Sequence, residues 1–281
     1  MVAETQPQLT LKHDLHQYLS LKSSIIRNYI IDMVTAGNSS HMGCALSITD
    51  ILTVLYHCYI DTDLIKTQSL DRDYVILSKG HAASALYATL ATVGLLSQEN
   101  LTTYYQNGSL LLGHPVRNNA LGVEASTGSL GHGLPMAVGL ALAAKHDQRK
   151  NHTYVIVGDG ECQEGTIWES IILATRFQLD NLTIIVDYNN LQGLDRTDDL
   201  VPGGFFNKFK GFGCLTLAID GHNYGDLIKA LSLPNVDKTL KVIIAKTSKG
   251  RGISFIQDKL EWHYKTFNAE QFNAAKKELS L

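Results

Sequence analysis

Apolar residues follow two patterns along the chain, and the two patterns alternate. Five short runs, rich in β-branched and aromatic residues, are almost continuously apolar, as expected for strands of a parallel sheet covered on both faces. These runs span residues 74–77, 153–157, 182–186, 215–219 and 242–245. Between them, helical spacing of apolar residues predicts helices near 80–93, 133–148, 166–176 and 224–233. This alternation predicts an α/β fold with a doubly wound, mainly parallel sheet and helices on both faces.

The two ends of the chain show further helical patterns. Apolar positions at spacings of three and four predict a helix over 11–36, and a second helix is expected over 47–58 with Ser47 as its N-cap. From about residue 250 the strand pattern is lost. We expect a C-terminal extension there, over about 250–281, made of a loop and a final helix at 268–279 that reaches beyond the domain.

Composition restricts the classes of protein that fit. The 281 residues are 44% hydrophobic and show no internal repeat, which predicts a single domain over residues 1–281. Charged residues make up 18% and the net charge is −3, so nothing favours nucleic acid or a membrane as partner. No apolar run approaches the roughly 20 residues of a membrane helix, and the N-terminus lacks a secretory pattern. Four cysteines without metal or pairing spacing favour a reduced, cytoplasmic protein.

Polar residues with oxygen ligands follow two of the predicted strands. Gly158, Asp159 and Gly160 come directly after the run 153–157, and Asn189 follows the next run, thirty residues after Asp159. Ligands of open α/β sheets bind at the carboxyl ends of strands, and hard oxygens suit Mg²⁺ or Ca²⁺, which hold phosphate groups. The two glycines allow a phosphate to approach the backbone, near the start of a helix. Gly-Asp-Gly alone is commonly an ordinary strand–turn–helix corner, but the second strand end favours a metal and phosphate site.

The spacing of Gly-Asp-Gly and Asn-Asn resembles the thiamin diphosphate motif, and the sequence around it resembles transketolase. The similar segments are Gly-Asp-Gly-Glu-Cys-Gln-Glu-Gly with Trp-Glu at 158–169, Asp-Arg with Leu-Ser-Lys-Gly-His-Ala at 71–82, Gly-His-Pro at 113–115, Gly-Val-Glu with Thr-Gly-Ser-Leu-Gly at 122–131, and Ser-His-Met-Gly at 40–43. The resemblance covers only the first domain of a transketolase, the one that holds the diphosphate. It implies the thiamin-diphosphate-binding fold and the N-terminal subunit of a split transketolase.

The resemblance also implies a reaction and a partner. A transketolase transfers a two-carbon ketol unit from a ketose or ketose phosphate to an aldehyde acceptor. The glutamate that activates the cofactor lies in the pyrimidine-binding domain, which this chain lacks. We therefore expect activity only with a separate C-terminal subunit, in a heterodimer or heterotetramer, and an inactive isolated chain.

The resemblance assigns roles to individual residues. The metal ligands, for Mg²⁺ or alternatively Ca²⁺ or Mn²⁺, are Asp159, Asn189 and the main-chain carbonyl of Leu191. The contacts to thiamin diphosphate are His81, Gly128, Leu130, Gly158, Asp159, Gly160, Glu161, Asn189 and His263. The catalytic residues are His41 and His263 near the reacting carbon and His114 at a substrate hydroxyl. The acidic residues of a network at the subunit interface are Glu164 and Glu169.

Three positions depart from the family pattern. Met42 stands where the family usually has proline, Cys44 where it often has glycine, and Tyr264 where split relatives commonly have glycine. A phenol at position 264 would narrow the substrate channel or add a hydroxyl to it. These differences suggest a substrate other than the pentose phosphates.

Two alternatives remain open. One is a specialised carboligase that forms acyloins, or an enzyme like deoxyxylulose-phosphate synthase, which would have to decarboxylate pyruvate. The other is a non-catalytic half that only binds a partner. The second is disfavoured because the candidate histidines and metal ligands are all present.

Overall fold

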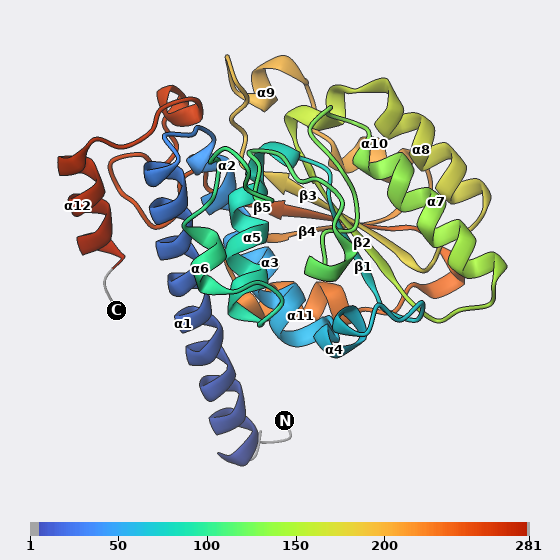
Figure 1. Ribbon diagram of the computed structural model, residues 1–281. Helices are drawn as coiled ribbons and strands as arrows, with labels where there is room; N and C mark the ends of the chain where they lie inside the picture. The colour runs from blue at the N-terminus through green and yellow to red at the C-terminus, as the bar shows by residue number, and fades with distance from the viewer. Residues whose placement is uncertain (1–5, 280–281) are drawn as a thin grey trace.

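The computed structural model describes residues 6–279, and a five-stranded sheet lies at its centre between two layers of helices (Figure 1). The strands are β1 (Tyr74–Leu77), β2 (Thr153–Gly158), β3 (Leu182–Tyr188), β4 (Leu215–Asp220) and β5 (Lys241–Lys246). Every neighbouring pair is parallel, and the order across the sheet is β1-β2-β3-β5-β4. The predicted doubly wound parallel sheet is confirmed, and the strands β1 to β4 begin at the predicted residues.

The helices follow the predicted alternation. They are α1 (Gln6–Ala36), α2 (Met42–Ser47), α3 (Thr49–Val54), α4 (Thr62–Lys66), α5 (Ala83–Thr92), α6 (Gln98–Leu101), α7 (Gly133–His146), α8 (Gly165–Arg176), α9 (Thr197–Leu200), α10 (Phe206–Gly211), α11 (Tyr224–Ser232) and α12 (Ala269–Glu278). A π-helical turn at Leu55–Tyr59 follows α3, and short 3₁₀ turns lie at Gly80–Ala82, Asn119–Leu121, Gly160–Gln163, Val236–Lys238 and Leu260–His263. None of the described helices is both long and apolar enough to cross a membrane.

Each face of the sheet has its own apolar core. Ile156 and Ile185 point to the layer that contains α1, α3, α5 and α11, whereas their neighbours Val155 and Ile184 point to the layer of α7, α8 and α10. Successive residues of a strand point to opposite faces, so a strand buried on both sides is apolar throughout. This explains why the central runs are nearly continuous in the sequence.

The strand β4 differs from the prediction. It pairs only with β5, at the edge of the sheet, and most of its side chains are partly exposed. The expectation that this strand is covered on both faces was therefore wrong. The short apolar run at 215–219 did not distinguish a half-covered edge strand from a central one.

The segment predicted as one helix over 47–58 is divided, and Ser47 is not its N-cap. Ser47 ends α2, and α3 begins at Thr49 without a side-chain cap. The buried Ser47 hydroxyl lies 3.0 Å from the Cys44 carbonyl and 2.6 Å from the carboxylate of Asp187. A serine before an apolar run is typical of a cap, but here a tertiary hydrogen bond uses the hydroxyl.

The predicted C-terminal helix is present as α12, which lies on the outer side of α1 and packs against it (Figure 1). The Lys276 ammonium lies 2.8 Å from the carboxylate of Asp32 and 3.1 Å from the amide oxygen of Asn28, both on α1. Asn268 caps the helix through a capping box with Gln271.

The register of the central strands brings the predicted site together. Gly158 lies beside Asp187 in the pairing of β2 with β3, and the Asp159 N–H donates to the Asp187 carbonyl at 3.2 Å. Tyr188 lies beside Lys246 in the pairing of β3 with β5. The carboxyl ends of these strands therefore meet at one edge of the sheet, where α/β proteins bind ligands.

Candidate active site

A pocket of about 470 Å³ opens at the carboxyl ends of β1, β2 and β3. Its size suits a small-molecule ligand. It is lined by His41, Cys44, Lys79, His81, His114, Gly128, Leu130, Gly158, Asp159, Gly160, Glu161, Gln163, Glu164, Asn189, Leu191, Gln192, Gly193, His263 and Tyr264. The structure thus brings together all the predicted site residues except Glu169.

The inner end of the pocket rests on a buried ion pair. The Lys79 ammonium lies 2.5 Å from the Asp187 carboxylate, and both side chains are almost fully buried. Ser47, Asn189 and Thr247 also donate hydrogen bonds to this carboxylate. Burial alone would raise the pKa of Asp187, but the Lys79 charge and these donors hold it below its usual value. Asp187 is therefore ionised and neutralised before any ligand binds.

Asp159 is buried beside this pair without a cation of its own among the described residues. Its carboxylate accepts hydrogen bonds from the N–H groups of Gly160 at 2.8 Å and Asn190 at 2.7 Å, and from the hydroxyl of Thr197 at 3.0 Å. Burial, and then the nearby Asp187 charge, raise the pKa of Asp159 to about 6. A buried carboxylate supported only by neutral donors fits a site for a divalent cation.

The other two predicted metal ligands lie next to Asp159 in a bonded turn. The Asn189 amide oxygen accepts from the Leu191 N–H at 3.1 Å, and the Leu191 carbonyl accepts from Lys249 at 3.0 Å. The Asn190 side chain holds the turn by accepting from the Asp198 N–H at 2.8 Å. The described residues contain no cluster of three His, Cys, Asp or Glu that could hold a metal. A cation here would need amide, carbonyl and ligand oxygens beside Asp159.

The glycines that line the pocket have different surroundings. A Cβ added at Gly158 would meet no protein atom nearer than 3.8 Å, so the space beside it is free for a ligand. Gly128, by contrast, is needed by the protein, because its φ is +149° and a Cβ would lie 2.8 Å from the His114 ring. Its backbone is 2.7 Å from where a Cβ on Gly80 would lie. The two glycines let the loops that carry His81 and His114 approach each other.

Four histidines surround the middle of the pocket, and His41 is central among them. Its ring centroid lies 5.2 Å from that of His81, 5.3 Å from His263 and 6.5 Å from His114. His41 adopts a left-handed backbone conformation with φ of 69°, which is unusual for a residue other than glycine. Its N–H donates to the His263 carbonyl at 3.2 Å, which ties the two segments together. Local strain of this kind is typical of functional sites.

Three of these imidazoles, those of His41, His81 and His263, are held neutral. Burial, followed by the charges of nearby groups, lowers the pKa of His41 to about 4 and that of His263 to about 3, and holds the pKa of His81 well below its usual value. The Lys249 ammonium lies 2.6 Å from Nδ1 of His263. Because an ammonium can only donate, this nitrogen accepts and the proton of the neutral ring lies on Nε2. Neutral rings can accept or donate a proton near a reacting atom.

The predicted acidic residues Glu161, Glu164 and Glu169 lie in different surroundings. Glu161 lines the pocket, but its buried carboxylate accepts from the Ser78 hydroxyl at 2.5 Å, the Gly131 N–H at 2.8 Å and the Gly158 N–H at 3.0 Å. It therefore joins the ends of β1 and β2 to the loop before α7. Burial raises the pKa of Glu161 despite these donors.

Glu164 and Glu169 are exposed at the start and on the surface of α8. Neither makes an ion pair within the described residues. The buried carboxylate network expected at these two positions is absent from this chain by itself.

Sequence reasoning missed several residues that build the site. Lys79 was named only as part of a similar segment and Lys249 was given no role, although both are buried and bind the strand ends. Thr197, on the short helix α9, is fully buried against Asp159. A lysine directly after an apolar strand was an available signal for Lys79, because a buried lysine requires a partner. Nothing in the local sequence indicated Thr197.

Comparison with known proteins agrees with this geometry. Residues 20–281 match the family model described as transketolase, thiamine diphosphate binding domain. The chain belongs to the transketolase family. It is 40% identical over 265 residues to an apulose-4-phosphate transketolase subunit of Actinobacillus succinogenes, covering 93% of this chain and 95% of that protein. It is 34% identical over 277 residues to 6-deoxy-6-sulfo-D-fructose transketolase subunit SqwG of Clostridium sp., covering 98% of both.

Solved transketolase structures share this fold over part of their length. The transketolase of Campylobacter jejuni superposes with a TM-score of 0.87 at 32% identity, over 94% of this chain but 43% of that chain. Like the two related subunits, this transketolase chain is therefore an N-terminal subunit that holds the thiamine diphosphate binding domain. Part of the resemblance of the segments 71–82 and 122–131 to transketolase has a structural reason. Arg72 and Glu124, one in each segment, form a buried ion pair through two contacts of 2.8 Å.

Proposed function

We propose that this chain holds thiamin diphosphate and a divalent cation for a two-subunit transketolase, and that a separate C-terminal subunit completes the active site. The observation that carries the proposal is the buried Asp159 carboxylate, which has only neutral donors, beside Asn189 and the histidine cluster. A divalent cation, most simply Mg²⁺, would neutralise this carboxylate and would supply positive charge for a diphosphate.

The residues present fit the cofactor. Asp159, Asn189 and the Leu191 carbonyl would hold the cation, while the open backbone at Gly158 and the neighbouring Gly160 turn, covered by the Gln192 side chain, would receive the diphosphate. The buried ammonium of Lys249 lies at the same strand ends and adds positive charge toward it. When bound, the cofactor supplies a carbanion that attacks a ketose carbonyl and carries the two-carbon unit.

The histidines have complementary tasks in this proposal. His41 and His263 are neutral and lie in contact, so they can pass protons to and from the substrate oxygen as the carbon–carbon bond breaks and forms. His81 is the most buried of the group and would contact the diphosphate. His114, at the junction of two pockets, would bind a substrate hydroxyl.

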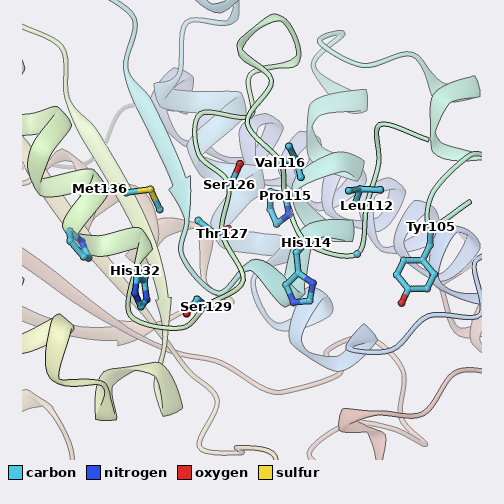
Figure 2. Close-up of a pocket in the computed structure, with 12 residues that line it drawn as sticks. Tyr105, Leu112, His114, Pro115, Val116, Ser126, Thr127, Ser129, His132 and Met136 are labelled. Atoms are coloured by element: carbon cyan, nitrogen blue, oxygen red, sulfur yellow. The ribbon is translucent and has the colours of Figure 1, made fainter. Parts of the chain in front are cut away.

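A second hollow beside the site suits the partner subunit. It has a volume of about 710 Å³ and shares His114 with the first pocket. Figure 2 shows Tyr105, the segment from Leu112 to Val116 and the segment from Ser126 to Met136 around it. Tyr105, Leu112, Val116 and Met136 are each between 37% and 54% exposed. A contiguous apolar surface next to an incomplete active site fits a protein interface.

The relatives bear on the partner and the substrate. The related short chains are each named as one subunit of a transketolase, which implies a further subunit, while the matching solved transketolase is more than twice as long. We propose a heterodimer or heterotetramer in which that second polypeptide covers the hollow and the exposed Glu164 and Glu169. The related subunits act on different sugar derivatives, so we propose a ketose or ketose phosphate donor and an aldehyde acceptor. Free cysteines, including the exposed Cys58, suit a reducing cytoplasm.

The experiment uses the chain together with its partner, co-expressed from the neighbouring reading frame if that frame encodes a pyrimidine-binding domain. Ketol transfer and pyruvate decarboxylation are assayed in parallel, with the chain alone as a control. Transfer by the pair and not by the single chain is expected. Pyruvate turnover without ketol transfer would instead favour an enzyme like deoxyxylulose-phosphate synthase, and cofactor binding without any turnover would favour a non-catalytic half.

A binding measurement tests the site directly. Asp159→Ala should abolish cation-dependent binding of thiamin diphosphate in calorimetry, because the charged ligand is lost. Glu270→Ala, at the exposed first turn of α12, is the matched control and should bind like the wild type. Unchanged affinity in Asp159→Ala would contradict the proposed metal site.

A further inference from the structure

Tyr264 lies at the outer end of the pocket, beyond the histidine cluster. Its side chain is 65% exposed, whereas Lys79 and Lys249 at the inner end are almost fully buried. Its ring centroid lies 4.4 Å from that of His263 and 5.6 Å from that of His41. A substrate that approaches these two histidines from the side of Tyr264 would therefore contact the phenol.

The backbone of Gly193 forms the wall opposite the phenol. A Cβ added at Gly193 would lie 3.2 Å from the Tyr264 hydroxyl and 4.0 Å from Nε2 of His263. Any side chain at position 193 would thus press on the phenol. The pair of Tyr264 and Gly193 sets the width of the entrance.

No exposed lysine or arginine is among the described residues that line the pocket near Tyr264. Lys79 is the only lysine or arginine among the residues that line the pocket, and it lies at the inner end. Lys265, next to Tyr264 in the sequence, is held over the Trp262 ring at 5.7 Å. Within residues 6–279 the Tyr264 hydroxyl has no hydrogen-bond partner, so it is available to a ligand. An aromatic face with a free hydroxyl suits the C–H and O–H groups of a polyol better than a phosphate group.

We propose that Tyr264 is a specificity-determining residue that recognises the uncharged, hydroxylated carbons of the acceptor sugar. Its ring packs on the carbon chain, and its hydroxyl bonds to the substrate hydroxyl next to the reacting carbonyl. The inference rests on the proposed function, because it assumes that a sugar reaches His41 and His263 through this entrance.

The test compares acceptors that differ by one hydroxyl, using the cofactor-loaded assembly of both subunits, with erythrulose as a fixed ketose donor. Glyceraldehyde is compared with propanal, and glycolaldehyde with acetaldehyde. Tyr264→Phe removes only the hydroxyl, so the preference in kcat/KM for the hydroxylated acceptor should fall about five- to tenfold. The loss should appear in KM, with kcat for propanal within about twofold of the wild type.

Two further variants test the width of the entrance. Tyr264→Gly removes the wall and should raise kcat/KM for ribose relative to glycolaldehyde, while Gly193→Ala should lower the same ratio. Tyr18→Phe, at a partly exposed tyrosine of α1, is the matched control and should leave both ratios unchanged. Circular dichroism melting curves verify that each variant is folded.

The outcomes separate the two proposals. Ratios within about twofold of the wild type in both Tyr264 variants of an active assembly would overturn the role of Tyr264 alone. Absence of ketol transfer by the wild-type assembly would overturn the proposed function, and this inference with it.

Discussion

The inner and outer ends of the pocket are constructed in opposite ways. At the inner end, Lys79 and Asp187 are buried, charged and bonded to each other and to neighbouring donors. At the outer end Tyr264, and beside the pocket the hollow in Figure 2, present exposed aromatic and apolar side chains with few internal hydrogen bonds. Buried charges are stable only when paired, so the inner end is organised within this chain. The outer end has the exposed apolar character of a surface that another molecule covers.

The largest effect should come from breaking the inner ion pair. Lys79→Met would leave the Asp187 carboxylate buried without its cation, so the free energy of unfolding should fall by about 3–5 kcal/mol. Urea denaturation measures the change. Adding Asp187→Asn to Lys79→Met should restore much of the loss, because the uncompensated charge is then removed. Additive losses in the double variant would show that the two side chains are not coupled.

A charge introduced on the outer surface should leave the stability of the chain almost unchanged but weaken binding of the partner subunit. Val116→Asp should change the free energy of unfolding by less than about 0.5 kcal/mol, because the residue is 50% exposed. It should nevertheless weaken the partner subunit's binding at least about tenfold, since an unpaired carboxylate would be buried in an apolar interface. Calorimetry of the two subunits measures the affinity. Leu233→Asp, at an equally apolar exposed position after α11, is the control and should bind normally.

The inner end should also respond to pH through Asp159. Its pKa is raised to about 6, so below this pH the carboxyl is protonated and a proton competes with the cation. Binding of Mn²⁺ with thiamin diphosphate should weaken about tenfold for each pH unit below 6. Calorimetry between about pH 7.5 and pH 5 measures this slope, and Asp159→Asn should remove it.

Without a ligand, a fall in pH should have the opposite effect, because protonation of Asp159 stabilises the folded chain. A raised carboxyl pKa means that the folded chain binds this proton more tightly than the unfolded chain. The contribution of Asp159 to stability is therefore greatest below about pH 4 and is lost as the pH rises through 6. A metal-free Asp159→Asn variant should accordingly be more stable than the wild type at about pH 7.

The smallest effect should come from Thr197, which supports Asp159 from the outside. Thr197→Val removes one of three donors to the carboxylate and leaves the N–H groups of Gly160 and Asn190 in place. Affinity for the cation and cofactor should fall about three- to tenfold. Thr197→Ser retains the hydroxyl and should bind like the wild type. Equal losses in both variants would attribute the effect to packing and not to the hydrogen bond.

Much of the fold could be predicted because the central strands are buried on both faces. The continuous apolar runs at 153–157 and 182–186 identified β2 and β3, and the helices between the strands followed from their periodicity. The failures at Ser47 and β4 have a common cause. The same local sequence can supply either a helix cap or a tertiary hydrogen bond, and it can form either an edge strand or a central strand. Only the surrounding elements distinguish these cases.

The residues of the candidate site were likewise only partly predicted from the sequence. Asp159 and Asn189 were found from the sequence, because ligands gather at the ends of parallel strands and the motif spacing reflects two neighbouring strands. Lys79, Lys249 and Thr197 were not assigned roles, because their partners are distant in the sequence.

The sequence by itself therefore determined the class of fold, the family resemblance and many of the residues that line the pocket. Only the tertiary structure decided which of those residues are free to meet a ligand. The Glu161 carboxylate already accepts hydrogen bonds from three donors of this chain, whereas Asp159 is a buried carboxylate without a cation among the described residues. Only the structure, too, located Tyr264 outside the histidines and not among them. Composition and spacing record which chemical groups are present, whereas burial and long-range contacts set their charge and their access to solvent.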